Sequence, residues 1–408
     1  MPSSRYPAPV WLKGLSNSTF GLYGGFVTFT LPQLLAAEHV PEARLTALCV
    51  AATSPVFWAF VLGPMLDVRF SRRFYATFFT VLSGLSMIAA VLCSAKPVAL
   101  TVLSTIGFAA AAVVQNAVGG WLSTITQKDE ENSLSAWFTV ANLGGCSVMA
   151  LIGAEAIAHL PLLAAGVLLG AMLQIPALIF LWMPAPGPDR RLARESFGGF
   201  FREILGLFKR REVVIALVLL LSPAASFSLT NLLGGVGADF HASPRLVSLL
   251  GGAFIGLAGV AGSLLLPVFA KKLALRPLYL AIGGTGALFT LALILLPHTP
   301  WSFALALVGE NVFQSLAITC SVAIVFETIG RNNPLAATTF SFLLAAYGLP
   351  LEWMLLVDGR AYSHGGVAAS YAADGALGLA ACLLLGLMLA YVRRGSTKVE
   401  EVELEAAS

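Results

Sequence analysis

Long apolar runs, separated by short polar segments, extend along nearly the whole chain. A helix needs about 20 apolar residues to cross the hydrocarbon layer of a membrane, which is about 30 Å thick. Breaks at proline, glycine and charged residues divide the chain into twelve runs of roughly this length. The predicted spans are 10–35, 43–64, 74–94, 98–122, 133–157, 161–183, 213–233, 246–270, 277–296, 301–325, 335–357 and 370–391. The pattern therefore predicts an all-α membrane protein with twelve transmembrane helices.

The composition excludes the main alternatives. Of the 408 residues, 58% are hydrophobic and only 11% are charged, whereas a soluble globular protein carries about 25% charged residues. Soluble and disordered proteins are therefore excluded. The five cysteines lie in apolar runs with no paired or metal-ligand spacing, so we expect no disulfide, no metal and no cofactor. We also expect no nucleic-acid partner, and a monomer embedded in the lipid bilayer.

Lysine and arginine are distributed unevenly between the two sets of loops that the predicted spans define. If both termini are cytoplasmic, 20 of the 24 basic residues lie on the cytoplasmic side. The other side keeps only Arg44, Lys96, Arg245 and Arg360. Because cytoplasmic loops of membrane proteins carry an excess of Lys and Arg, this orientation is favoured. We expect a multi-pass protein of the cell inner membrane with both termini in the cytoplasm.

The chain divides into two halves of six predicted spans each. The longest polar segment, 184–212, lies between spans six and seven. An offset of 203 residues aligns Pro64 with Pro267 and Lys128 with Arg331, which is the form of a parallel repeat. We therefore expect two pseudo-symmetric six-helix bundles. The predicted units are an N-terminal bundle at 1–183, a cytoplasmic linker at 184–212, a C-terminal bundle at 213–393 and an acidic cytoplasmic tail at 394–408.

The linker contains an amphipathic segment. Phenylalanine and isoleucine recur at helical spacing, among charged residues, at Phe197, Phe200, Phe201, Ile204 and Phe208. This pattern predicts a short helix that lies on the cytoplasmic surface of the membrane. Such a helix can serve simply as a tether between the halves, and the alternative is a regulatory or partner-binding role.

A charged segment follows the second predicted span, where the sequence from Gly63 to Arg73 reads GPMLDVRFSRR. Asp67 can pair with Arg69, Arg72 or Arg73, or with the N-terminus of a helix across the interface between the bundles. A contact of this kind would exist in one conformation and break in another, so we predict that these residues form a gate. The alternative is that the arginines only set the topology.

Glu310 is the clearest ionisable residue inside a predicted span, about nine residues into span ten. A charged group near the middle of a bilayer is costly and is therefore a functional candidate. Gln314 lies one helical turn further on the same face, and Asn311 is adjacent. We predict that Glu310 binds a coupling proton or contacts a solute. A structural hydrogen bond to a neighbouring helix is the alternative.

Uncharged polar residues recur in spans one, four, five and seven. Where such residues converge they can line a cavity, and singly they join neighbouring helices. The candidates for a central cavity are Asn17, Tyr23, Gln115, Asn116, Asn142, Ser222 and Ser226. Four acids fall near predicted outer ends of spans, where we expect them to lie in the wet interface of the membrane. They are Glu155, Glu352, Asp358 and Asp374.

The segment after span two resembles the signature of the major facilitator superfamily, G-x-x-x-D-R-x-G-R-R. Gly63 and Asp67 match, whereas Val68 stands at the first basic position and Ser71 takes the place of the turn glycine, one position late. In the second half Ala270 stands where Asp67 would map, so an acidic gate is expected in one half only. The resemblance implies the twelve-helix fold of that family, a substrate site between the halves near mid-membrane, and alternating access.

Three stretches are also similar to the peptide–acetyl-CoA transporter group, which includes the AmpG-type muropeptide permeases. These stretches are 23–32, 57–67, and 310–313 with the run 336–344. The similarity implies proton-driven transport of amphipathic metabolites such as muropeptides or acyl-CoA-like compounds. Siderophore uptake is another role of twelve-span carriers of this form.

Taken together, these features predict a secondary active transporter that moves a small organic solute by alternating access, coupled to protons. A passive channel or a solute sensor is the alternative from another class. We do not expect an enzyme, because the five histidines are scattered over separate predicted outer loops and no paired-carboxylate site appears at one membrane face.

Overall fold

The computed structural model describes residues 8–184, 197–331 and 333–407, and these ranges contain helices and no strands. The first span consists of α1 (Val10–Leu15), α2 (Ser18–Gly25), η1 (Phe26–Thr30) and α3 (Leu31–Ala37). The second consists of α4 (Glu42–Thr53), α5 (Pro55–Trp58) and η2 (Ala59–Asp67). Spans three to six are α6 (Arg72–Leu92), α7 (Pro97–Ile125), α8 (Glu131–His159) and α9 (Leu162–Ile179).

The second half follows the linker helix α10 (Phe197–Leu207). Span seven consists of α11 (Arg211–Leu220), η4 (Pro223–Ala225), α12 (Leu229–Leu233) and η5 (Gly237–Phe240). Span eight consists of α13 (Pro244–Leu249), η6 (Leu250–Phe254) and α14 (Ile255–Ala270). The remaining helices are α15 (Leu275–Leu293), α16 (Pro300–Ile329) and α17 (Ala336–Ala407).

The helices are consistent with the twelve predicted spans. In the part of the chain that the structure describes, nine helical stretches are long and apolar enough to cross a membrane. One of these, Ala336–Tyr391, consists of two helices, because Gly365 and Gly366 between them leave the helical conformation. Spans seven and eight are each divided, span seven by the 3-10 turn η4 and span eight by the π-helical turn η6. The predicted all-α membrane fold is confirmed.

Local sequence explains where helices begin and break. The hydroxyl of Ser71 accepts a hydrogen bond from the backbone N–H of Phe74 at 3.2 Å and so caps α6. Span seven breaks at Pro223, which has no backbone N–H to donate, and Phe227 beyond it has a positive φ of 52°. The reversal between the last two spans uses Gly366, whose φ of 65° is a conformation that glycine adopts without steric cost.

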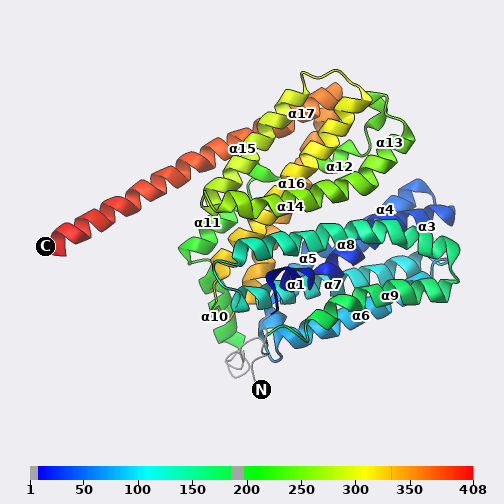
Figure 1. Cartoon of the computed structure of the whole chain (residues 1–408), viewed down its shortest axis with the longest axis horizontal. Coiled ribbons are helices and arrows are strands. Elements are labelled where there is room, and N and C mark those ends of the chain that lie inside the picture. The colour runs from blue at the N-terminus through cyan, green and yellow to red at the C-terminus, as the bar shows by residue number, and fades with distance from the viewer. Residues whose placement is uncertain (1–7, 185–196, 332, 408) are drawn as a thin grey trace.

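The helices form two groups, one from α1 to α9 and the other from α11 to α17 (Figure 1). The groups meet at the end of the molecule that carries α10 and α11, which we call the linker end, and lie further apart at the end that carries α4 and α13 (Figure 1). Small residues permit the close approach at the linker end. A Cβ atom added to Gly120 in α7 would lie 2.5 Å from the Cα atom of Ala337 in α17.

Two acids expected in the membrane interface are buried instead. Asp358 is 0% exposed and Asp374 is 6% exposed, whereas Glu155 and Glu352 are exposed as expected. The prediction is wrong for the first two because the bounds 335–357 and 370–391 put Asp358 just beyond the end of one predicted span and Asp374 only four residues after the start of the next. The helices of α17 run on past those points, to Gly365 and from Gly366, and carry both acids inside the bundle.

The linker and the tail are described in part. The helix predicted in the linker is confirmed as α10. Residues 185–196 of the predicted linker and Ser408 of the predicted tail lie outside the described residues. For residues 392–407 the structure describes a helical backbone only, so the acidic side chains of the tail are not placed.

Candidate functional site

A cavity of about 360 Å³ lies between the two halves of the molecule. Spans one, two, four and five line one side of it, and spans seven, ten and eleven line the other. Most of the lining is apolar or aromatic, and the polar members are Gln115, Asn116, Asn142, Ser341 and Tyr347. The structure thus brings together the three candidate amides of spans four and five, and it adds two hydroxyl groups from α17 that we had not predicted.

The amide groups of this central cavity are available to a solute. No described residue forms a hydrogen bond with the side-chain amide of Gln115, Asn116 or Asn142. The hydroxyl group of Tyr347 is buried and also has no partner in the described part of the chain. The three amides keep accessible surface and can therefore bond to a solute in the cavity, whereas the Tyr347 hydroxyl is closed off from it and contributes only its ring to the wall.

Asn311 and Gln314 lie apart from the central cavity. They line a smaller cavity of about 70 Å³ between spans one, five, eight and ten. The amide of Asn311 donates to the carbonyl of Leu307 at 2.7 Å, and that of Gln314 donates to the hydroxyl of Thr230 at 2.8 Å. The second bond joins α16 to α12, so Gln314 also holds helices of the second half together.

Asn17 and Tyr23 of span one lie outside both cavities, and their prediction as cavity residues is wrong. Asn17 is fully buried and donates to the backbone carbonyl of Phe138 at 3.4 Å. The ring of Tyr23 is fully buried and stacks near that of Phe108, with 6.1 Å between ring centroids. Both side chains pack span one against its neighbours in the first half, which is the usual role of isolated polar residues in membrane helices.

Ser222 and Ser226 of span seven serve the break in that helix rather than the cavity. The hydroxyl of Ser222 accepts from the backbone N–H of Ala224 at 3.4 Å and donates to the carbonyl of Leu219 at 2.7 Å. Ser226 donates to the carbonyl of Pro223 at 3.5 Å. These bonds satisfy backbone groups freed by the proline, so this prediction too is wrong.

Glu310 lies inside the second half, not in the central cavity. Its side chain is 0% exposed and accepts a hydrogen bond from the hydroxyl of Thr290 at 2.5 Å. Asp358 and Asp374 are two further buried acids of the second half. The hydroxyl of Ser228 joins these two acids, since it contacts Oδ2 of Asp358 and lies 3.2 Å from Oδ1 of Asp374. We call Glu310, Asp358 and Asp374 the acid cluster.

The acid cluster has no cationic partner among the described residues. Oε2 of Glu310 and Oδ1 of Asp358 make no hydrogen bond with a described residue, and neither does the buried hydroxyl of Tyr371. Within the described ranges no group of Asp, Glu, His or Cys could hold a metal ion. Buried charges of one sign destabilise a protein by several kcal/mol per ion, so this arrangement is suited to holding a proton.

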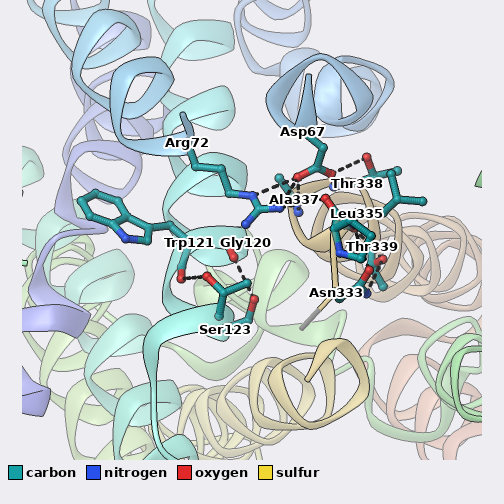
Figure 2. Close-up of polar contacts among 12 residues, drawn as sticks. Asp67, Arg72, Gly120, Trp121, Ser123, Asn333, Leu335, Ala337, Thr338 and Thr339 are labelled. Carbon is teal, nitrogen blue, oxygen red and sulfur yellow. Dashed lines mark hydrogen bonds and ion pairs between the residues drawn. The ribbon is translucent and has the colours of Figure 1, made fainter. Parts of the chain in front are cut away.

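Asp67 joins the two halves at the linker end, and Figure 2 shows it between Arg72 and the start of α17. Its carboxylate accepts two hydrogen bonds from Arg72, at 2.9 and 2.7 Å. Across the interface it accepts from the backbone N–H groups of Ala337 and Thr338 at 3.1 and 2.7 Å, and from the Thr338 hydroxyl at 2.7 Å. Arg72 donates to the carbonyl of Pro334 at 3.0 Å. Asp67 therefore caps a helix of the opposite half.

The other two arginines of the predicted gate are not partners of Asp67. Arg69 lies over a neighbouring phenyl ring, 5.9 Å from its centroid, and has a positive φ of 71°. Arg73 is partly exposed and forms no ion pair with a described acid. A second bond between the halves runs from Arg331 to the carbonyl of Thr126 at 2.9 Å. In this structure the linker end is therefore closed.

The linker helix α10 packs on the gate. Ile204 and Leu207 are buried against Leu335, next to Val68 and Phe342. Phe342 also lines the central cavity. The linker helix thus reaches the start of α17 and the wall of the cavity, which is more contact than a simple tether requires.

Comparison with known families gives one match. The model described as Major Facilitator Superfamily matches residues 14–349 of the chain. No curated protein sequence matches the chain significantly.

Several solved transporter structures are similar in fold. The proton:xylose symporter XylE, bound to 6-bromo-6-deoxy-D-glucose, has a TM-score of 0.67 at 15% identity, over 94% of this chain and 96% of that one. The human organic anion transporter MFSD10 has a TM-score of 0.66 at 16% identity, over 92% and 98%. FucP in the outward conformation has a TM-score of 0.67 at 12% identity, over 92% and 99%. At such identities the likeness shows the fold alone.

Proposed function

This chain belongs to the Major Facilitator Superfamily, a family of transporters, and on that premise we propose that it is a secondary active transporter of a small organic solute. One observation carries the proposal. The central cavity lies between two halves that are fastened to each other at the linker end by the Asp67 cap. Release of that cap would let the halves rock and open the cavity at the linker end, which is alternating access.

We further propose that the linker end faces the cytoplasm and that the protein lies in the cell inner membrane. The bias of 20 of 24 basic residues towards the loops of that end supports this orientation. Both termini then lie in the cytoplasm.

Proton coupling through the acid cluster is part of the same proposal. The geometry of Ser228 supports it, because a hydroxyl group has only one hydrogen to donate. Ser228 contacts a carboxyl oxygen of Asp358 and one of Asp374, so both contacts can be hydrogen bonds only if one of the two acids donates a proton of its own. Glu310, whose Oε2 makes no hydrogen bond with a described residue, is the group to which we assign the exchange of that proton.

The acid cluster and Ser228 lie on several spans of the second half, so a movement of these spans relative to one another would alter the contacts of the acids. Ser228 precedes α12 in the broken span seven, Glu310 belongs to α16, and the two aspartates belong to the two helices of α17. Spans seven, ten and eleven also line the central cavity. A movement of these spans when a solute binds would therefore change the contacts of the proton, and this links the two sites.

Transport in proteoliposomes tests both parts of the proposal. Vesicles are bathed in a defined mixture of small organic solutes, and uptake is followed by mass spectrometry with and without a pH gradient. We expect uptake that the gradient accelerates in the parent protein, and loss of the acceleration in Glu310→Gln. Glu155→Gln is the matched control, because Glu155 is an exposed acid far from the cluster in sequence. If the pH gradient accelerated uptake equally in the parent and in Glu310→Gln, coupling through Glu310 would be refuted. If none of the solutes were taken up, transport would be refuted.

A further inference from the structure

We propose that the central cavity selects an uncharged, ring-containing solute that is mostly apolar and carries one or two hydrogen-bonding groups. This inference rests on the proposed transport function and names its substrate class. It follows from three features of the cavity: its aromatic and amide lining, the absence of charged lining residues, and its volume.

The wall of the cavity carries no charge. None of its lining residues is Asp, Glu, Lys, Arg or His. Phe20, Phe57, Phe60 and Phe342 contribute aromatic surface, and the rings of Phe60 and Phe342 lie 5.4 Å apart. A charged solute would lose its hydration here and find no opposite charge, which is strongly unfavourable in a site of low polarity. Ring systems, by contrast, gain both burial and aromatic contact.

The charged residues that we assign to the gate and to proton coupling do not line the cavity, and their bonds go to other groups of the protein. Asp67 is saturated by Arg72 and by the first turn of α17. The acid cluster belongs to the interior of the second half, and none of its members lines the cavity. Neither group can neutralise a solute in the cavity without giving up the bonds described above. The phosphates of an acyl-CoA-like compound therefore have no partner here.

Three unpaired amides give the cavity its specificity. Gln115, Asn116 and Asn142 line it, and their side-chain amides have no hydrogen-bond partner among the described residues. Other amides within the spans, such as those of Gln174 and Gln314, do bond to the protein. The cavity thus offers neutral donors and acceptors, which match an amide, a carbonyl or a hydroxyl of a solute.

The size of the cavity limits the solute. A volume of about 360 Å³ lies near the lower end of the range of roughly 300–1,000 Å³ that is usual for small-molecule sites. A molecule of one or two rings with a short polar substituent fits such a space, whereas a glycopeptide of several units does not.

Matched sets of compounds test the charge selectivity. One set is phenylbutanamide, phenylbutyrate and phenylbutylamine, and a second is naphthylacetamide, naphthylacetate and naphthylethylamine. Each set keeps the ring and changes the charge. Thermal unfolding of the full-length protein in detergent is measured with each compound, because a ligand that binds only the folded state raises the melting temperature. We expect the amides to raise it and the carboxylates and amines to leave it unchanged. Equal or larger shifts with the charged members, or no shift with either amide, would overturn the inference.

Variants then locate the binding. Asn116→Leu and Gln115→Leu each remove one hydrogen-bonding group from the cavity, and we expect each to weaken amide binding roughly two- to tenfold. Tyr23→Phe is the control, since it removes a polar group from a buried position away from the cavity. Unchanged affinity in both cavity variants would overturn the assignment.

Counterflow separates this inference from the proposed function. Exchange of charged solutes but not of amides would leave the transporter proposal intact and overturn the substrate class. Amide binding that depends on Asn116, without any counterflow, would leave the selectivity of the cavity intact and overturn transport.

Discussion

Replacement of Asp67 by asparagine should open the linker end. The carboxylate accepts five hydrogen bonds, two from Arg72 within its own half and three from Ala337 and Thr338 across the interface. Of these five bonds, only the three across the interface are lost when the halves separate, so only they contribute to the conformational bias that Asp67 provides. The bonds from Arg72 to Pro334 and from Arg331 to Thr126 also cross the interface and remain in the variant. Asparagine keeps one oxygen, but it presents an NH₂ group towards N–H donors and carries no charge to cap α17.

The size of the effect follows from these contacts. A hydrogen bond to a charged group contributes about 1.5–3 kcal/mol, and breaking a buried charged contact costs about 3–5 kcal/mol in all, because such bonds are not additive. We therefore expect the closed state to lose about 3–5 kcal/mol relative to the open state. At about 1.4 kcal/mol per tenfold change, this shifts the ratio of closed to open molecules by a factor of roughly 10² to 4 × 10³.

The assay is a distance measurement between spin labels at Thr77 and Lys272, in a background without cysteine. Both positions are exposed, and they follow spans two and eight in opposite halves near the linker end. We expect a longer distance to dominate in Asp67→Asn. Asp129→Asn is the control, because it removes the same charge from an exposed position at the same end. A distance distribution in Asp67→Asn that matches the parent would refute the gate.

Three further predictions use the same reasoning. Gly120→Leu should also lengthen the distance between the labels, because its Cβ would lie 2.5 Å from Ala337 in the closed state; Gly206→Ala, with open space around it, should not. Leu207→Ala should weaken closure by up to about 2–3 kcal/mol, since it removes a buried contact of α10 with the gate, and a label distance equal to that of the parent would contradict this. Ser228→Ala should abolish acceleration of uptake by a pH gradient while the label distance stays that of the parent; retained acceleration would exclude the shared proton.

Much of the fold could be predicted from the sequence, because lipid imposes a simple rule. Backbone groups in a membrane must bond internally, so every long apolar run becomes a helix, and the basic loops mark one side. Asp67 could be identified for a related reason, since a carboxylate beside arginines at a helix end has few other roles. Its true partner in the first half is Arg72, and only the fold could show that the chain between them turns back, with Arg69 in a left-handed conformation.

The sequence could not predict which polar residues line the cavity and which bond to neighbouring helices. Gln115 and Asn17 look alike in sequence, yet one lines the central cavity and the other bonds to a carbonyl of α8. Which face of a span meets a neighbouring helix depends on packing against residues far away in the chain. The acid cluster was missed for the same reason, because Asp358 and Asp374 come near Glu310 only when spans ten, eleven and twelve pack together.

The cap at Asp67 has no counterpart in the second half, so the two edges of the closed interface are held differently. One edge, where η2 meets α17, is held by the hydrogen bonds of Asp67. The other edge, where α8 meets α14, has Ala270 in place of an acid at the linker end. At the opposite end of α14, a Cβ atom added to Gly256 would lie 2.3 Å from the hydroxyl oxygen of Ser147 in α8. Close packing of this kind is what a rotation of one half against the other about the contact of α8 with α14 would require. In the proposed mechanism the linker end would open widest beside Phe342 and α10, so a solute would pass the linker helix, which would first have to move away.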